Sequence, residues 1–556
     1  MKHFFALAVT AALLAGCGGG GGGDSLPPAN QPGLSAAVPA VVTISGKITF
    51  DYVPIAIASS NTPRLDYANT VRLPARSISV ALIDSTNGAE LAADKTNATG
   101  DYSLVGPVGK SVFVRAYAKL MPVNASTTEI VSVLDNTNAD AQWATDGAAF
   151  SSVDGTRLTK NLNASSGWTG TSYNDSQRVA GPFAILDTIY SNMQKIVAVD
   201  SSASFQKLSV HWSPNNVAAS GTIALGQIVK SFFRETTAGG VVTARDLYIL
   251  GKADNDTDEY DPHVVAHEFG HYLQSVFSRD DSIGGTHGGT DDRLDMRVAF
   301  SEGWGNGWSG YSLGNKFYAD TSGAGQADGF SFDISVGERT NPGWFKESSV
   351  QKIIWDLSTG SIGFGSVWTA IKTGFATSPA LTSAHSFANA LRVNLPSSLA
   401  TLNTIFGNQS ITVPSDAYGT GETNFGSPTI AEIRPIYTSY GVLGSSSNVC
   451  VTNAADSSSA GNKAGEHRYL KLTLPAGTRT FTVARDSATS TAGIATDPDF
   501  RVYSATGALL IGESPAANSE SASAVLAGGN YVLSLNDFTF QTASTLRRSC
   551  FNVTVN

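Results

Sequence analysis

The chain has 556 residues, of which 42% are hydrophobic and 15% are charged, with a formal net charge of −10. This length exceeds one ordinary hydrophobic core, so about three domains are expected. The acidic balance and the lack of any Lys/Arg-rich run argue against a nucleic-acid partner.

Residues 1–17 have the pattern of a secretory signal peptide. A polar start precedes an apolar run, residues 4–14, that is too short to cross a bilayer as a stable helix. The following "LLAGC" resembles a bacterial lipobox, which implies cleavage before Cys17 and lipid attachment to its thiol. Residues 18–40, rich in Gly and Pro, predict a flexible linker. We therefore expect a lipoprotein of the bacterial cell envelope, anchored to a membrane and facing the periplasm or the exterior. The alternative is an ordinary signal peptide in which Cys17 is incidental.

Residues 41–120 predict a β-sandwich. The segments "VVTISGKITF" and "RSISVALID" alternate apolar and polar residues, and "GDYSLVG" and "KSVFVRAYA" follow across glycine turns. The run "ELAADKTNATGDYSL" resembles the carboxypeptidase-regulatory or transthyretin-like sandwiches of exported bacterial proteins. That resemblance implies a spacer or adhesive module without chemistry of its own.

Residues 140–440 mix helical and strand patterns. The segment "GPFAILDTIYSNMQKI" places one apolar face on a helix, and "GWFKESSVQKIIWDL" does the same. The segments "KLSVHW" and "VVTARDLYILG" read as strands, the second sitting either at a sheet edge that binds substrate or inside a sheet. Such mixing predicts an α+β domain.

Residues 446–556 return to strand patterns. The pieces "YLKLTLPAGT", "DPDFRVY" and "LAGGNYVLSL" resemble the pre-peptidase C-terminal β-sandwiches of secreted bacterial proteases, which are not catalytic. Apart from Cys17, the chain has two cysteines, Cys450 and Cys550. In an exported chain such a pair predicts a disulfide, the alternative being two buried thiols.

The segment "DPHVVAHEFGHYLQSVF" contains the H-E-x-x-H spacing at His267, Glu268 and His271. Asp261 is placed to cap a helix that begins at Pro262. At about 100° per residue, the two histidines lie together on the side opposite the apolar stripe, where they can bind one metal ion. Glu268 is then placed to take a proton from a metal-bound water.

A third ligand must come from elsewhere in the chain. His263 lies about 12 Å from His271 along the helix axis, too far for one zinc ion, and is expected to be a surface or supporting group. An aspzincin-like pattern would use Asp292, but its Tyr-Gly continuation is missing. The segment "SEGWGNGW" offers Glu302, whose neighbouring glycines would let two helices approach closely.

H-E-F-G-H followed by an E-G-W segment resembles the gluzincins, and most nearly the fungalysin and thermolysin-like metallopeptidases. The resemblance implies that His267, His271 and Glu302 bind one Zn²⁺ and that Glu268 is the general base. It also places at Asn306 the residue that orients a ligand histidine, where the family has an aspartate. An amide there still accepts a hydrogen bond but makes the ligand less basic.

Two weaker features remain. Asp254, Asp256 and Asp258 alternate as a Ca²⁺ loop begins, but the following glycine and the distal glutamate are missing, which favours a solvated acidic turn. His287 lies in a Gly-rich loop, from which it could reach the cleft and stabilise an oxyanion, but no family motif aligns with it and the pattern favours an exposed loop histidine.

These observations predict a multidomain chain with an α+β zincin-like catalytic domain flanked by two all-β sandwiches. We expect an exported zinc endopeptidase with a protein or peptide substrate. One alternative is a surface-binding or adhesive lipoprotein with a structural or degenerate zinc site. Another is zinc-dependent hydrolysis of a non-peptide bond.

Overall fold

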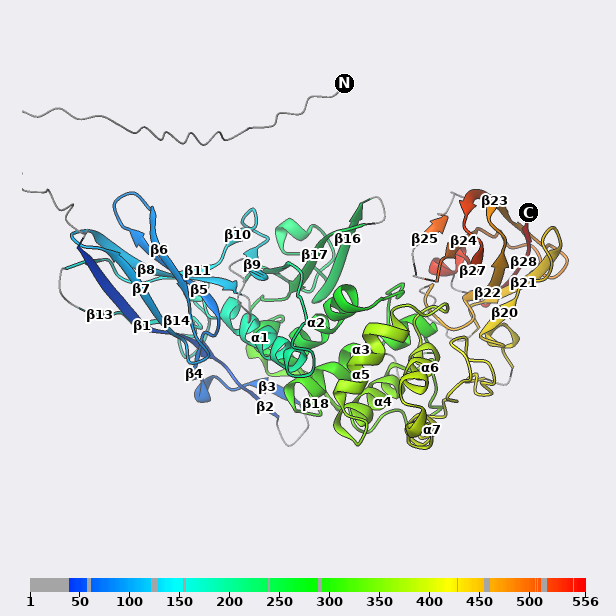
Figure 1. Ribbon diagram of the computed structural model, residues 1–556, viewed down its shortest axis with the longest axis horizontal. Helices are drawn as coiled ribbons and strands as arrows, with labels where there is room; N and C mark the ends of the chain where they lie inside the picture. The colour runs from blue at the N-terminus through cyan, green and yellow to red at the C-terminus, as the bar shows by residue number, and fades with distance from the viewer. Residues whose placement is uncertain are drawn as a thin grey trace, which may run out of the picture. The chain divides into compact units, whose positions relative to one another are not determined.

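The computed structural model shows an α+β chain with several β-sheets and a helical central region (Figure 1). It describes residues 40–57, 62–121, 129–153, 157–238, 241–288, 293–427, 429–454, 461–505, 507, 509–511, 518–543 and 545–556. The predicted signal peptide, Cys17 and nearly all of the predicted linker lie outside this part. Among the described helices, none is both long and apolar enough to cross a membrane.

Strand β1 is the centre of a five-stranded sheet in the first part of the chain. Its inward residues Ile44, Ile48 and Phe50 are fully buried, as the predicted alternation requires. Strand β1 pairs antiparallel with β4 and β7 and parallel with β13 and β14. The bounds are β1 Val41–Tyr52, β4 Val71–Pro74, β7 Asp101–Pro107, β13 Arg157–Thr159 and β14 Leu162–Ala164.

A ten-stranded sheet joins strands from both sides of residue 130, seven of them in the order β16-β17-β15-β9-β8-β5-β6. The other three are short: β10, Ala141–Gln142, pairs with β9, and β11, Ala144–Asp146, and β12, Phe150–Ser151, pair with β8. Strand β15 pairs in parallel with both β9 and β17, so "LYILG" at the end of β17 is an interior strand and the edge is β16. The bounds are β5 Ile78–Asp84, β6 Glu90–Lys95, β8 Ser111–Leu120, β9 Val131–Asp135, β15 Leu208–Trp212, β16 Phe232–Ala238 and β17 Val241–Ile249.

The helices of the central region confirm the predicted apolar faces. In α1 the five residues expected to face the core are all buried, namely Ile185, Leu186, Ile189, Met193 and Ile196. Helix α1 contacts β8 and β9, and α2 contacts β16 and β17. The bounds are α1 Gly181–Val199, α2 Pro262–Phe277, α3 Met296–Leu313, α4 Glu347–Thr359, α5 Phe364–Ala370, α6 Ala384–Asn394 and α7 Leu399–Gly407.

Helix α3 packs between α2 and α4, and its glycines make the close approach possible. A Cβ atom added at Gly305 would lie 2.8 Å from the ring of His267 on α2. Added Cβ atoms would lie 2.4 Å from Val350 at Gly303 and 2.6 Å from Ile354 at Gly307, both on α4. Glycine is a poor helix former, so this segment is helical because tertiary packing outweighs its low propensity.

Two further sheets at the C-terminal end share a second hydrophobic core, which makes this part a β-sandwich. Strand β21, Ser446–Thr452, pairs with β28, Arg548–Val555, with Cys450 directly opposite Cys550. The predicted disulfide between them is confirmed. The other strands are β20 Tyr437–Ser439, β22 His467–Leu474, β23 Gly477–Arg485, β24 Pro498–Tyr503, β25 Leu509–Ile511, β26 Ser519–Leu526 and β27 Gly529–Asp537.

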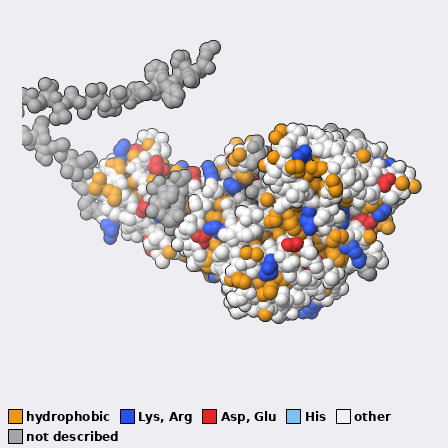
Figure 2. Space-filling model, turned by 45° about the vertical axis from the view of Figure 1, so that its right-hand side comes forward, with side chains coloured by type: hydrophobic (Ala, Val, Ile, Leu, Met, Phe, Trp, Pro, Cys, Tyr) orange, Lys and Arg blue, Asp and Glu red, His pale blue; other side chains and the backbone are white. Residues whose placement is uncertain are grey.

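The disulfide is typical of a protein that lies outside the cytoplasm, because such bonds persist in oxidising compartments. On the face shown in Figure 2, charged side chains are scattered among polar and apolar ones, in keeping with the low charged fraction.

Candidate metal centre

Helices α2 and α3 bring His267, His271 and Glu302 together. The His267 and His271 Nε2 atoms are 3.2 Å apart, and Glu302 Oε2 lies 3.3 Å from His267 Nε2 and 3.9 Å from His271 Nε2. Ligands bound tetrahedrally to zinc at ~2.0–2.1 Å lie about 3.4 Å from one another. The two imidazoles and the carboxylate therefore can hold one metal ion, and the donor set is the kind zinc prefers.

Each histidine of this group has a hydrogen-bond partner at its other ring nitrogen. His267 Nδ1 lies 2.8 Å from Asn306 Oδ1, and the Asn306 amide nitrogen donates to Gln351 Oε1 at 3.1 Å. Because Gln351 fixes the amide, its oxygen faces the imidazole and accepts the Nδ1 proton. This leaves the Nε2 lone pair for the metal.

His271 is supported through Ser301. Its Nδ1 lies 3.2 Å from the Ser301 hydroxyl, which donates to Asp280 Oδ2 at 2.7 Å. Burial raises the pKa of Asp280 to about 7. Sequence reasoning missed both residues, although Ser301 directly precedes Glu302 in the "SEGW" segment.

Glu268 lines the same cavity but is not one of the three residues whose ligand atoms lie close together. Its Oε2 accepts a hydrogen bond of 2.8 Å from the backbone N–H of Phe233, at the start of edge strand β16. Burial raises the pKa of Glu268 above its usual range, and His267 works in the opposite direction. The carboxylate is thus held on the cavity side of α2, where it can exchange a proton with a bound molecule.

Burial and neighbouring charges shift the pKa values of His267, His271 and Glu302 away from their ordinary values. Burial alone would lower the pKa of His267, but its hydrogen bond to Glu302 and the nearby carboxylates raise the pKa to about 9. Burial lowers the pKa of His271 to about 4. Burial would raise the pKa of Glu302, yet the neighbouring histidines hold it well below its usual range.

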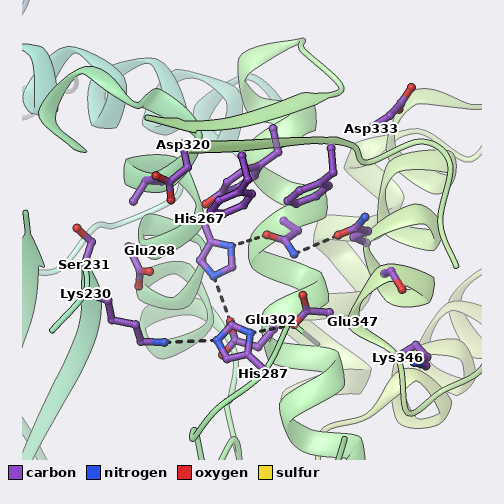
Figure 3. A pocket seen from close by; sticks show the side chains of 18 of the residues that line it. Lys230, Ser231, His267, Glu268, His287, Glu302, Asp320, Asp333, Lys346 and Glu347 are labelled. Atoms are coloured by element: carbon purple, nitrogen blue, oxygen red, sulfur yellow. Dashed lines mark hydrogen bonds and ion pairs between the residues drawn. The ribbon is translucent and has the colours of Figure 1, made fainter. Parts of the chain in front are cut away.

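The loop between α2 and α3 brings His287 to the same place (Figure 3). Its Nε2 lies 3.4 Å from Glu302 Oε2 and 3.4 Å from Lys230 Nζ, and its Nδ1 lies 2.9 Å from Glu347 Oε2. The imidazole is thus fixed in the cleft, at 21% side-chain exposure, and the expectation of an exposed loop histidine is wrong. His287 does not share the close ligand geometry of the other three residues.

Two further residues were weighed as metal ligands from the sequence, His263 and Asp292. His263 is outside the metal-ligating group, but it is buried, and its Nε2 lies 3.1 Å from the carbonyl oxygen of Asn315. The predicted surface position is therefore wrong, because Tyr318 of β18, Phe317–Ser322, covers the first turn of α2. Asp292 lies outside the described residues.

The group opens into a cavity of about 790 Å³. His267, Glu268, Glu302 and His287 line it, and Figure 3 shows them around one shared space. The hairpin of β18, Phe317–Ser322, and β19, Asp328–Asp333, forms the cavity wall next to His267 and contributes three stacked aromatic rings. These rings belong to Tyr318, Phe330 and Phe332.

No protein family and no curated protein matches this sequence. The pre-peptidase C-terminal domain of collagenase from Bacillus anthracis is similar over 22% of this chain and 94% of its own, at 9% identity and TM-score 0.16. PliG of Aeromonas hydrophila, a periplasmic inhibitor of g-type lysozyme, is similar over 22% and 96%, at 15% identity and TM-score 0.16. A 9R-lipoxygenase from Cyanothece PCC8801 is similar over 72% and 73%, at 8% identity and TM-score 0.14. Similarities this weak carry no conclusion about function, which must be argued from the site.

Proposed function

We propose that this chain is an exported zinc-dependent endopeptidase. One observation carries the proposal: His267, His271 and Glu302 form a three-ligand group, and Glu268 lies beside it, unliganded, in the same cavity. Three protein ligands with an open fourth position are typical of catalytic rather than structural zinc sites. Zinc bound there would polarise a substrate carbonyl and lower the pKa of a coordinated water towards about 7.

Glu268 acts as the general base and acid in this proposal. Its carboxylate accepts the proton of the attacking water and then donates it to the leaving amine. The N–H of Phe233 keeps one carboxylate oxygen in place, so the other oxygen remains for the proton. A raised pKa suits a group that must both accept and release a proton near neutral pH.

His287 and Lys230 would stabilise the negative charge that develops on the carbonyl oxygen. Both line the cavity next to the ligand group, and Glu347 fixes the imidazole through Nδ1. Burial would lower the pKa of His287, but Glu347 and Glu302 raise it, which favours an N–H at Nε2. Fixed donors aimed at developing charge are a large contribution to catalysis.

The walls of the cavity suit an extended polypeptide. Strand β16 is the sheet edge nearest Glu268 and has β17 as its neighbour on one side only. An extended chain can add to such an edge through backbone hydrogen bonds. The rings of Phe330 and Phe332, which line the cavity, would then contact apolar side chains of the substrate.

The test is Glu268→Gln in protein loaded with zinc, with His263→Gln as the matched control. We expect Glu268→Gln to retain one zinc per chain and to lose peptide cleavage by about 10²–10⁴-fold. His263 is also buried on α2 but lies outside the ligand group, so His263→Gln should retain both. Peptide cleavage by Glu268→Gln at the wild-type rate would overturn the proposal. Cleavage of esters or sugars but not peptides would place the activity in another hydrolase class, and absence of zinc would favour an adhesive protein.

The predicted membrane anchor remains part of this proposal. A lipid on Cys17 would hold the enzyme at a membrane of the cell envelope, with residues 18–40 as the tether. Partition of the expressed chain into detergent, lost in Cys17→Ser, would support the anchor. Equal partition of both forms would contradict it.

A further inference from the structure

A second group of potential metal ligands consists of four aspartates, three of which line the same cavity. Asp256, Asp258 and Asp261 come from the segment that leads into α2, and Asp320 comes from β18. One carboxylate oxygen from each lies within 4.8 Å of the others. The sequence placed the first two in a solvated acidic turn, whereas the fold buries Asp258 and brings Asp320 to it from 62 residues away in the chain.

The carboxylates are only partly satisfied by the protein. Asp258 is 2% exposed; its Oδ2 accepts a hydrogen bond from Ser231, but its Oδ1 has no hydrogen-bond partner among the described residues. The same is true of Asp256 Oδ1. Buried polar atoms without partners are rare in proteins, and each one requires a reason. An unpartnered oxygen that lies within such a group is placed to bind a cation.

The electrostatics of the four aspartates also favour a bound cation. Burial raises the pKa of Asp256 to about 6, with Asp258 working in the opposite direction and Glu259 adding to the rise. Burial raises the pKa of Asp320 to about 7, and the charge of Asp256 adds to this shift. In the described structure, none of these aspartates forms an ion pair with Lys or Arg. Like charges this close cannot all ionise unless a cation neutralises them.

We propose that Asp256, Asp258, Asp261 and Asp320 bind one Ca²⁺ ion. Calcium takes oxygen ligands at 2.3–2.6 Å, so ligand atoms on opposite sides of the ion can lie about 4.8 Å apart. Mg²⁺ needs shorter bonds, of about 2.0–2.1 Å, and usually keeps several waters instead of binding to a cage made of protein carboxylates alone. Zinc prefers the nitrogen-rich group described above.

The ion would join two elements that form the cavity. Asp261 directly precedes α2, and its carboxylate accepts hydrogen bonds from the Thr321 N–H at 2.7 Å and from the Thr321 hydroxyl at 2.9 Å. Asp261 thus occupies the predicted N-cap position of α2, but its carboxylate makes no capping hydrogen bond and instead ties the start of the helix to β18. Calcium would reinforce this connection and fix the β18–β19 wall relative to the helix that carries His267 and His271.

Calcium titration of the zinc-loaded full chain, freed of other divalent ions by ion exchange, tests the site without reference to peptidase activity. We expect calorimetry to show one strong Ca²⁺ site per chain and thermal unfolding to shift upwards in CaCl₂, with a much smaller effect of MgCl₂. Asp258→Asn should abolish the binding and the shift while its zinc content stays at one. Asp328→Asn, an exposed carboxylate on the same hairpin, is the control and should behave as wild type.

Asp258→Asn also removes one of the repelling charges, so in calcium-free buffer it should unfold at a higher temperature than wild type. Folded wild-type protein that binds no Ca²⁺ would overturn the proposal. Calcium binding that persists unchanged in Asp258→Asn would also overturn it and would place the ion elsewhere, for example at Asp497, Asp499 and Glu520 of the C-terminal sandwich. Either result leaves the zinc proposal untouched.

Discussion

At the scale of single residues, Asn306 is a neutral amide that fixes His267, one of the three proposed zinc ligands. The amide oxygen faces His267 Nδ1 because Gln351 takes the amide hydrogen on the other side. A carboxylate would fix the same tautomer and would also increase the basicity of the imidazole. Asn306, where the resemblance to gluzincins implies an aspartate, thus still fixes the imidazole but lacks the charge of a carboxylate.

Asn306→Ala should therefore lower zinc affinity by about 10–100-fold, because the imidazole loses the acceptor that fixes it. Asn306→Asp should bind zinc at least as tightly as wild type. Competition with a chromophoric chelator measures both affinities. Equal affinity in all three proteins would show that Asn306 does not orient the ligand.

His287 tests the proposed stabilisation of the oxyanion. His287→Ala should reduce kcat by about 10²–10³-fold, with a smaller change in KM and one zinc still bound, because the missing donor acts mainly on the transition state. Steady-state kinetics with metal analysis separates these effects. Loss of zinc from this variant would instead make His287 a ligand.

At the scale of secondary-structure elements, the approach of α2 to α3 depends on Gly305. An added Cβ there would lie 2.8 Å from the His267 ring, closer than real Cβ contacts allow. Gly305→Ala should displace the ring and lower zinc affinity at least ~10-fold, as other disturbances around metal ligands do. The control is Gly407→Ala on α7, where an added Cβ meets nothing within 4 Å. Zinc affinity unchanged in Gly305→Ala would contradict this account of the packing.

The connection between α2 and β18 should make stability depend on pH. The folded-state pKa values of Asp256, about 6, and of Asp320, about 7, lie above the ordinary value of 3.8. The protonated forms therefore favour folding, and this stability is lost as pH rises from about 4 to above 7. The groups that face these carboxylates are Asp258, Glu259 and Asp261 from the segment before α2, Ser231 and Thr321.

Thermal unfolding in calcium-free buffer should accordingly occur at a lower temperature at pH 8 than at pH 5. Added Ca²⁺ should raise the unfolding temperature more at pH 8, since it binds the ionised carboxylates. A pH profile of scanning calorimetry with and without CaCl₂ measures both effects. If the unfolding temperature depended on pH in the same way with and without CaCl₂, ionisation of these four aspartates would not control calcium binding.

At the scale of the whole molecule, the C-terminal sandwich is in direct contact with the helix that carries Glu302. The hydroxyl of Tyr469 on β22 donates to Asp295, whose carboxylate also caps α3 through the N–H of Arg297. Both Asp295 and Arg297 are fully buried and paired. The sandwich therefore supports the start of α3 in addition to folding around its own core.

The disulfide closes a segment of 100 residues around this sandwich. Removing it by Cys450→Ser with Cys550→Ser should lower the free energy of unfolding by about 4 kcal/mol, because the unfolded chain regains the freedom of a long loop. Urea unfolding followed by fluorescence measures the change. An unchanged urea midpoint of unfolding in the double variant would show that the disulfide adds nothing to the stability given by the pairing of β21 with β28.

Much of this protein follows from its sequence alone. Alternation of apolar residues predicted the strands, helical periodicity predicted α1, α2 and α4, and the cysteine pair predicted the disulfide, because each of these signals is local or chemically specific. The H-E-x-x-H spacing and the "SEGW" segment singled out the three residues that the fold brings within ligand distance.

The tertiary structure decided what depends on contacts between distant segments. No local sequence pattern predicts three of the contacts at the two sites. These are the contact of Ser301 and Asp280 with His271, that of His287 with Glu347, and that of Asp320 with Asp258. The same holds for the edge of the ten-stranded sheet, which is β16 because β15 covers the other side of β17. Periodicity reports which face of an element is buried, but only the packing of elements determines which side chains meet there.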